Sequence, residues 1–554
     1  MANDLLSTGI SGLTAYQRSL AVAGHNITNV NTEGYNRQSV DLVTREPSSL
    51  GVGFVGNGVE VSGVRRVYDQ FLSNEATLRR STYNQADALY TMASRVDGVL
   101  ASEASSLSPA IQAFFNAVHD VANNPTSAPA RQVLLTEAGT LTNRFAALDN
   151  EFGRLRDSVN AQVDVMASDI SGIAANIAEL NRDIVVAGTN PSDQLPNDLL
   201  DKRDQQVARL AELVSVRTVE VDDGSINVFI GNGQSLVLGF DAASLQSSTG
   251  EFDPGDHSIT FVGSTASFDI TAQLNGGRLG GLLDFRRNVL DPAQDGLGRI
   301  AVALSDSFNT QHRLGDDLNG NPGGDFFAPI AGSTPTVFSS TRNNPASGTL
   351  GVTIDDSTRL QASDYRLDYD GSNFSLLRLA DNTVVDSGFT VGDFPRTLSA
   401  EGVTLSLSGS VAAGDSFLVR PVRNGARDMA VAITDGSAFA AAASGNAAGD
   451  NGNALALAAQ QTQKLMGGGT ETYQSAYAKV LADAGVKTRE AETNSKAQQA
   501  LLNHAEEAVS EVSGVNLDEE AANLLRYQQA YAAAAQVVKA ADTLFQTLLS
   551  VTAR

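Results

Sequence analysis

Apolar residues recur every seven positions near both ends of the chain. The first series consists of Leu6, Leu13, Leu20 and Ile27, with Ile10 at an intermediate position. A spacing of seven residues places side chains on one face of an α-helix. The pattern therefore predicts an N-terminal helix with an apolar seam, which Gln17 and Gly24 weaken.

The second series lies close to the C-terminus and consists of Leu517, Leu524, Tyr531, Val538 and Phe545. Asn516 is a predicted N-cap for this helix, and the acidic residues 518–520 suit the positive end of its dipole. A seam that mixes Leu with Ala, Gly and Gln is too weak to hold a lone helix in water. Two interpretations stay open. The ends pair as an antiparallel coiled coil within one monomer, or they find their partners in other subunits.

Between the two ends the pattern changes several times. Long amphipathic helices are predicted from about residue 68 to 186, and Asn197 is expected to cap a shorter helix that follows. Alternating residues then predict strands within 214–240, before a helix over 281–315 that Pro292 should kink or split. Residues 331–425 are typical of short strands between turns, and 426–454 of a flexible or weakly helical connection.

This order of elements predicts an α+β multidomain protein. Its terminal helices would pair as a coiled coil, a long helical bundle would form a rod, and a mostly β outer domain would be inserted. We expect residues 1–35 and 513–554 to form the terminal helical domain. The rod domain with β hairpins would comprise 36–330 and 455–512, the outer β domain 331–425, and the connecting segment 426–454.

Composition narrows the function further. The 554 residues carry a net charge of −25, which argues against binding to nucleic acid or to an anionic membrane surface. The absence of cysteine excludes disulfides, thiolate metal sites and cysteine nucleophiles. No apolar window approaches the ~18 residues of a membrane span. The first residues lack the features of a cleavable secretory signal, so we expect none.

Two motifs resemble ligand sites but are better explained as turns. "GVGFVG", residues 51–56, matches the dinucleotide-binding pattern, yet it leads into alternating residues rather than a helix, so a hairpin is expected. "GDDLNGNPGGDFF" gathers acidic and amide side chains as a calcium loop does. Counted from Asp317, its sixth and twelfth positions are Pro322 and Ala328 rather than Gly and Glu. A polar loop is therefore expected, with calcium as the minor alternative.

The five histidines are scattered without an i, i+4 pair: His25, His119, His257, His312 and His504. No nucleophile stands beside a recognisable base, and no acidic pair faces another across a predicted cleft. The sequence therefore predicts no catalytic, cofactor-binding or metal-binding residues, and no enzyme.

The two ends carry motifs of one known family. "NITNVNTEGYNRQ", residues 26–38, resembles the opening motif of the rod, hook and hook-associated proteins, the axial proteins of the bacterial flagellum. "SGVNLDEEAANLLRYQQAYAAAAQVVKAADTLFQTLL" is similar to their closing motif. The family's packing motif falls on Asn26, Asn29, Thr32, Gly34, Tyr35 and Arg37. His25 stands where the family more often has a small or amide residue.

Two interior segments favour one branch of that family. "NDLLDKRDQQVARLAELV" and "GGRLGGLLDFRRNVLDPAQDGLGRIAVALSDSFNTQH" resemble the hook-associated protein 1 family. The resemblance implies a structural protein that polymerises at the distal end of the hook and forms the hook–filament junction. It also implies that both apolar series pack between subunits, in the inner wall of a tube.

The implied partners are further copies of the chain, the hook protein below, hook-associated protein 3 above, and a cytoplasmic export chaperone. The implied location is the extracellular flagellum, reached without a cleaved signal peptide. Two alternatives stay open. One is a hook or distal rod protein, and the other is an extracellular enzyme or adhesin that flagellar-type ends anchor, with its activity in residues 331–425.

Overall fold

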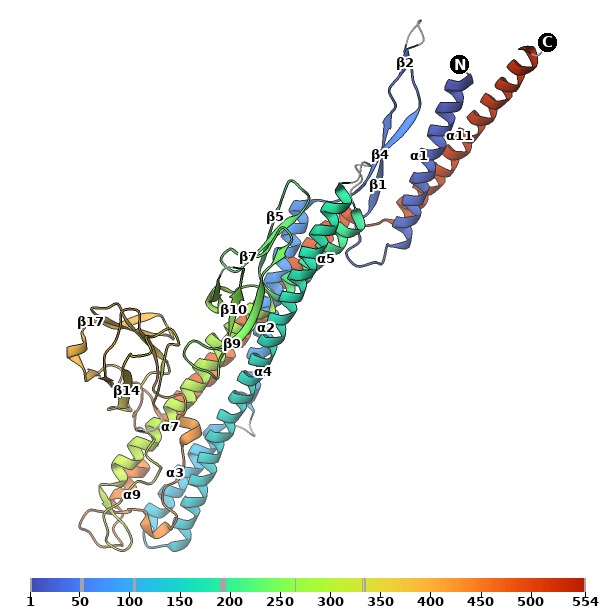
Figure 1. Ribbon diagram of the computed structural model, residues 1–554. Helices are drawn as coiled ribbons and strands as arrows, with labels where there is room; N and C mark the ends of the chain where they lie inside the picture. Colours follow the sequence, from blue (N-terminus) through green and yellow to red (C-terminus); the bar gives the residue numbers. More distant parts are fainter. Residues whose placement is uncertain are drawn as a thin grey trace.

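The computed structural model describes residues 2–49, 54–102, 106–189, 196–264, 266–330, 332 and 335–552. Over these residues the chain forms an elongated rod, with a helical hairpin at one end and a β domain at its side (Figure 1). This arrangement confirms the predicted α+β multidomain class. No helix among the described residues is both long and apolar enough to cross a bilayer.

The first and last helices pair with each other. α1 (Ala2–Thr28) and α11 (Leu517–Thr552) lie side by side and antiparallel, so both ends of the chain are together (Figure 1). The predicted coiled-coil pairing of the ends is therefore confirmed. A ribbon of β1 (Gln38–Thr44) and β4 (Val59–Arg66) packs along α1. Two short strands, β2 (Ser48–Ser49) and β3 (Phe54–Val55), pair at the far end of this ribbon.

The rod is a bundle of helices drawn from both halves of the chain. α2 (Gln70–Ala101) packs against α10 (Tyr473–Ser513), and α3 (Leu107–Asn123) packs against α4 (Ala128–Gly188). α4 is one uninterrupted helix of 61 residues. Its apolar residues are buried at intervals of three and four, which is the spacing that a bundle core requires.

Two predictions about helix boundaries have different outcomes. α6 (Gly277–Phe285) continues through a π turn, η2 (Arg286–Leu290), into α7 (Asp291–His312). Pro292 is the second residue after this turn, which agrees with the predicted irregularity, because proline cannot donate to the preceding turn. The predicted cap of α5 (Asn197–Leu213) is wrong. Pro196 occupies the cap position, and the Asn197 side chain donates to the Val64 carbonyl at 2.9 Å.

Two small antiparallel sheets lie against α4. The first contains β5 (Val216–Glu220), β6 (Ile226–Ile230), β7 (Gln234–Leu238) and β8 (Asp241–Ala242) in sequence order. The second contains β9 (Ser244–Thr249), β10 (His257–Val262) and β11 (Ser267–Asp269), followed by the short helix η1 (Thr271–Gln273). The predicted strands within 214–240 are thus confirmed.

The outer β domain contains two antiparallel sheets. The larger has the order β13 (Thr336–Ser339), β20 (Ser416–Arg420), β15 (Tyr365–Tyr369), β16 (Phe374–Arg378) and β17 (Thr383–Phe389). The smaller has the order β14 (Thr349–Ile354), β19 (Val403–Ser408) and β18 (Arg396–Leu398), and η3 (Val391–Asp393) lies between β17 and β18. Because the first and last strands of the domain pair, both of its connections leave on the same side.

The segment expected to be a flexible connection is firmly packed instead. It contains α8 (Gly425–Asp428), η4 (Gly436–Ala438), β21 (Ala442–Ala443), which pairs with β12 (Gly315–Asp316), and α9 (Gly452–Ala459). Phe439 is fully buried. The Arg131 guanidinium donates to the carbonyls of Gly436 and Phe439 at 3.0 and 2.6 Å. These long-range bonds, which composition cannot indicate, fix the segment on the rod.

Candidate functional site at the base of the terminal helices

The two terminal helices meet along small side chains. The buried positions of α1 are Gly9, Gly12, Ala15, Ser19, Ala23 and Asn26. A Cβ atom on Gly9 would lie 2.6 Å from Cγ2 of Val538, and one on Gly12 would lie 3.3 Å from Cβ of Ala534. The backbones therefore approach so closely that Gly9 has no room for a side chain.

Of the two apolar series, Val538 faces Gly9 in this seam, and most other members lie beside or outside it, which speaks against the interpretation that the two series pair with each other within one monomer. Leu6, Leu13, Leu20, Ile27, Leu524 and Val538 are only partly buried. The exposed fractions of Ile10, Leu517 and Phe545 are 50% each, and Tyr531 is also exposed. Small residues permit a closer approach, and the larger ones are left beside or outside the seam. Packing of these large residues between subunits stays a prediction.

The buried carboxamide of Asn26 joins three parts of the chain at the base of the hairpin. Its Oδ1 accepts from the Tyr35 hydroxyl at 2.7 Å and from the Gln38 N–H at 2.9 Å. Its Nδ2 donates to the Gln38 carbonyl at 2.9 Å and to the Glu520 carboxylate at 3.2 Å. One side chain thus ties α1 to the start of β1 and to the first turn of α11.

Arg37 forms the charged half of the same cluster. Its Nε lies 2.8 Å from Glu520 and its Nη1 lies 2.9 Å from Glu519. Its backbone N–H donates to the Ser513 carbonyl at the end of α10, at 2.9 Å. Glu520 is buried, so Arg37 neutralises a carboxylate that could not remain there alone. Asn516 caps α11 as predicted, since its Oδ1 accepts from the amide of residue 518 at 3.0 Å.

The remaining motif residues shape the turn between α1 and β1. The Asn29 side chain donates to the His25 carbonyl at 3.0 Å and accepts from the Thr32 hydroxyl at 3.1 Å. Gly34 has a φ of 78°, the left-handed region that favours glycine. The Tyr35 ring packs edge-on against His25, with ring centroids 5.5 Å apart. His25 is thus part of the turn's packing.

A second polar cluster fastens this turn to the rod. Asp201 of α5 accepts from the Asn36 side chain at 2.6 Å and from Arg66 at 3.1 Å. Arg66 also lies 2.6 Å from Asp204. Burial raises the pKa of both Asp201 and Asp204, although Arg66 opposes the rise. Hydrogen-bonded charges therefore contribute to the orientation of the terminal hairpin relative to the rod.

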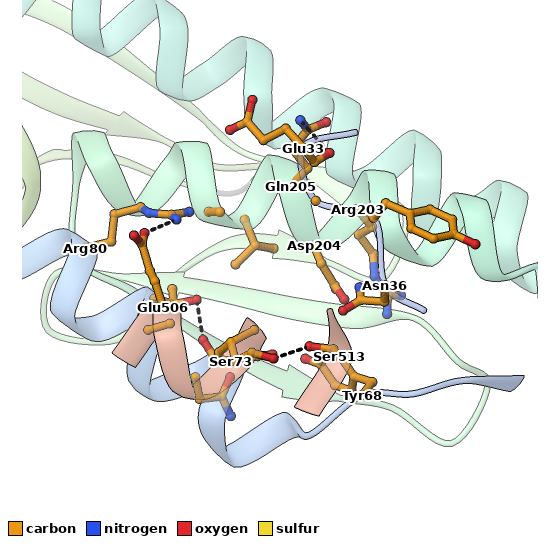
Figure 2. A pocket seen from close by; sticks show the side chains of 18 of the residues that line it. Glu33, Asn36, Tyr68, Ser73, Arg80, Arg203, Asp204, Gln205, Glu506 and Ser513 are labelled. Atoms are coloured by element: carbon orange, nitrogen blue, oxygen red, sulfur yellow. Dashed lines mark hydrogen bonds and ion pairs between the residues drawn. The ribbon is translucent and has the colours of Figure 1, made fainter. Parts of the chain in front are cut away.

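A cleft of about 610 Å³ lies beside these clusters, between the turn, α2, α5 and the end of α10 (Figure 2). Glu33, Arg203 and Asp204 line it, and Arg80 and Glu506 form an ion pair at 2.6 Å in its wall (Figure 2). Its walls carry both charge signs and no convergent nucleophile or base. The arrangement suits a joint between structural elements better than a catalytic pocket.

One group of residues outside this site has the composition of a catalytic triad. Oδ1 of Asp164 accepts from the Ser247 hydroxyl and from Nδ1 of His257, the latter at 2.6 Å. A triad needs the serine on the imidazole nitrogen opposite the aspartate. Here the serine and the imidazole share one carboxylate oxygen, so the serine is not activated as a nucleophile.

The motifs that resemble ligand sites are occupied by internal contacts. Oδ1 of Asp317 accepts from the amides of Asn319 and Asn321 at 2.7 and 2.8 Å, which closes the predicted polar loop. In "GVGFVG", residues 51–53 lie outside the described residues, while β2 and β3 pair on either side. Over the described part of the chain, no three His, Asp or Glu side chains are placed to hold a metal ion.

Sequence reasoning found the motif but missed its partners on the rod. Asp201 and Arg66 carry no local signal, because a single Asp or Arg on an amphipathic element is normally a solvated residue. The available hint was the apolar spacing of α5, which places Asp201 on its buried face.

Family models match the chain in four segments. Residues 93–327 match the flagellar hook-associated protein FlgK helical domain, and residues 338–421 match the flagellar hook-associated protein 1 D2-like domain. Residues 6–36 match the flagella basal body rod protein model. Residues 506–551 match the C-terminal model of the flagellar basal body rod FlgEFG proteins.

Relatives match along almost the whole chain. The flagellar hook-associated protein 1 of Salmonella typhimurium is 36% identical over 562 residues, which cover 99% of this chain and 100% of the relative. The protein of that name from Bacillus subtilis is 24% identical, covering 98% of this chain and 97% of the relative. The solved structure of the flagellar hook junction protein FlgK from Burkholderia pseudomallei has a TM-score of 0.74 at 28% identity. That match covers 79% of this chain and 100% of that one.

Proposed function

Because the chain belongs to the flagellar hook-associated protein 1 family, we propose that its paired terminal helices are the segments by which it joins neighbouring subunits. The protein is a structural component of the bacterial flagellum, at the junction between hook and filament. Residues 1–35 and 513–554 would be the polymerising domain. The rod of 36–330 and 455–512 would surround it, and the β domain of 331–425 would project from the assembly.

The observation that carries this proposal is the apolar outer surface of the terminal hairpin. Leu525, Leu544 and Phe545 are each exposed by 50% or more along α11. Several large apolar side chains exposed on one helix are typical of a surface that another molecule covers. A growing tube supplies such cover, because open helical assembly joins one surface patch to a different patch on the neighbour.

The small-residue seam explains how the hairpin can exist before assembly. Close backbone approach at Gly9 and Gly12 and the bonds of Asn26 and Arg37 hold the helices together. These contacts use little apolar surface, so the large side chains stay exposed to neighbours. The hairpin would therefore enter the assembly as a preformed unit.

The partners proposed for this surface are further copies of the chain, the hook protein on one side and hook-associated protein 3 on the other. The exposed face of α11 is also the surface that a cytoplasmic export chaperone would cover before assembly. The mature location is the extracellular flagellum, and we propose that the chain arrives there without cleavage of a signal peptide.

We further propose that the role is purely structural. The alternatives of a hook or distal rod protein and of an anchored enzyme or adhesin are not favoured. The interior of the chain matches hook-associated family models at 93–327 and 338–421. The second match covers the β region in which an added activity would have to lie.

The test uses purified full-length protein added to isolated hooks, with binding measured by co-sedimentation and by electron microscopy of the hook tips. The variant Leu525→Gln with Phe545→Gln should melt like the wild type but lose most of its addition to hooks. A matched control, Val165→Gln on the exposed side of α4, should add normally. Normal addition by the double variant would refute the proposal. If the control lost as much of its addition to hooks, the assay would be responding to any lost apolar residue. That result would also count against the proposal.

A second test removes both ends. A chain without residues 1–35 and 513–554 should stay folded, because its rod and β domain have their own cores, and should no longer add to hooks. Cooperative unfolding at a much lower temperature would instead make the terminal helices part of the monomer's core.

A further inference from the structure

A buried cluster of charged side chains, here called the ionic hub, lies where the outer β domain meets the rod. Its rod members are Arg156 of α4, Asp253 and Asp256 between β9 and β10, Arg286 of η2, and Asp291 and Asp295 of α7. Its β-domain members are Asp364 before β15, Arg420 at the end of β20, and Arg423 just beyond. The hub therefore contains more carboxyl than guanidinium groups, and Asp295, Asp364 and Arg423 among them are buried.

Two arginines of the hub bridge the domain boundary. Nη2 of Arg420 lies 3.1 Å from Asp256 on the rod, while its Nε lies 2.9 Å from Asp364 in its own domain. Arg423 binds Asp295 of α7 with two nitrogens, at 2.8 and 3.1 Å. Paired bonds of this kind fix orientation as well as distance. These two guanidinium groups therefore contribute to the angle of the β domain on the rod, together with the contacts that Ser340, Thr341 and Arg342 make with Glu251.

Asp364 is the member with incomplete pairing. Its Oδ2 is shared by Arg420 and Arg423, whereas its buried Oδ1 has no hydrogen-bond partner among the described residues. Burial raises the pKa of Asp364 to about 7, and the charges of Asp295 and Asp291 act in the same direction against the two arginines. The arginines instead hold the pKa of Asp291 below its ordinary value.

We propose that the ionic hub is a proton-responsive latch, in which Asp364 is neutral while the β domain is seated and its ionisation loosens the seat. Ionised Asp364 would add a negative charge to a buried site already rich in carboxylates, with one oxygen unpaired. The seated state therefore binds one proton more than the loosened state, in which Asp364 reaches water.

The direction of the pH effect follows from this difference. Because the pKa of Asp364 is raised in the seated state, Asp364 stabilises that state fully below about pH 4, and this stabilisation is lost as the pH rises through 7. Asp256 and Asp291 have a lowered pKa, so their stabilisation of the seated state is lost only when acid protonates them. The latch is thus tightest in weakly acidic solution. The backbone bond from Thr341 to Glu251, at 2.9 Å, does not titrate, so the domain loosens without detaching.

The test measures distances between spin labels on the full-length protein. The chain has no cysteine, so Val384→Cys on β17 and Val165→Cys on α4, both exposed, provide two defined labelling sites. The wild-type distance distribution should be narrow at pH 6 and at least about twice as broad at pH 8.5, on either side of the pKa of Asp364. With Asp364→Asn it should be narrow at both pH values. Asp222→Asn, at an exposed turn of the rod, should behave like the wild type.

A third variant separates the latch from a merely structural cluster. Asp295→Asn removes the two-nitrogen contact with Arg423 and should broaden the distribution even at pH 6, while melting curves report whether the rod stays folded. The proposal is overturned if the wild type is equally narrow at both pH values, if Asp364→Asn broadens as the wild type does, or if Asp295→Asn stays narrow.

Discussion

Replacing Asn26 by aspartate changes one atom group at the centre of the junction cluster. The two acceptor bonds, from Tyr35 and from the Gln38 N–H, can persist. The two donor bonds cannot, because the new oxygen faces the Gln38 carbonyl at 2.9 Å and the Glu520 carboxylate at 3.2 Å. The variant therefore keeps the shape of the cluster and reverses its electrostatics.

The expected cost follows from two competing outcomes. Two carboxylates 3.2 Å apart repel by about 5 kcal/mol at an effective dielectric constant of about 20, besides about 2 kcal/mol for two lost bonds. Keeping the new carboxyl protonated at pH 7, against an ordinary pKa of about 3.9, costs about 4 kcal/mol and allows it to donate one bond. Protonation is the cheaper outcome, and the one bond still lost adds about 1 kcal/mol, so we expect about 5 kcal/mol of destabilisation at pH 7.

The same reasoning fixes the pH dependence. The introduced carboxyl has a raised pKa in the folded state, so the cost of protonating it is absent below about pH 4 and grows as the pH rises. At pH 5 the protonation cost falls to about 1.5 kcal/mol. A mutation that merely removed packing would show no such recovery in acid.

The assay needs a signal from the terminal hairpin alone. The chain has no tryptophan, and Tyr527 lies partly buried on α11, so Tyr527→Trp provides one. Urea titrations of this background with and without Asn26→Asp, at pH 7 and pH 5, give the two free energies of unfolding. Asn516→Asp adds the same charge at a helix cap that tolerates it and should cost less than about 0.5 kcal/mol. A defect below about 0.5 kcal/mol at pH 7, or one of equal size at pH 5, would refute the reasoning.

Three further predictions concern single positions. Gly9→Ala should destabilise the hairpin by about 1–3 kcal/mol in the same tryptophan assay, because the new Cβ atom has no room. Gly24→Ala should instead stabilise the hairpin by up to about 1 kcal/mol, because nothing lies within 4 Å of the position of its Cβ atom. Arg37→Met should cost about 3–5 kcal/mol by leaving Glu520 buried without its partner, and a double change with Glu520→Gln should recover most of that loss. Burial lowers the pKa of His312, so neutral His312 contributes to the stability of the fold above about pH 6.5, and this contribution is lost as the pH falls. The melting temperature of the wild type should therefore drop more steeply between pH 7 and 5 than that of His312→Gln.

The motif at the end of α1 could be predicted because its chemistry is local. Asn29, Thr32 and Gly34 form their bonds and their turn within a few residues of one another, so the sequence pattern carries the structure. The long-range partners carry no such signal. Glu520 stands almost five hundred positions from Asn26, and only the fold brings the two side chains together.

The ionic hub and the segment after the β domain could not be predicted for the same physical reason. The aspartates and arginines of the hub are spread from Arg156 to Arg423 on elements that meet only after folding. Residues 436–443 are rich in Ala, Gly and Ser, a composition typical of a flexible linker. Their order comes from Arg131, whose guanidinium supplies donors for carbonyls that would otherwise be buried without partners.

The difference between the apolar series and the seam has a physical explanation that bears on function. Hydrophobic periodicity reports which face of a helix avoids water, but it does not say whether the cover comes from the same chain. In α1 and α11 the closest approach requires Gly9 and its small neighbours, a pattern that hydrophobicity scales barely register. If Leu517, Tyr531 and Phe545 instead filled the seam, the helices would stand farther apart and the hairpin would be polar outside. Such a hairpin would be more stable alone and would have nothing apolar to offer a neighbour. The seam of small residues is thus what we expect of a hairpin whose large side chains are kept for assembly.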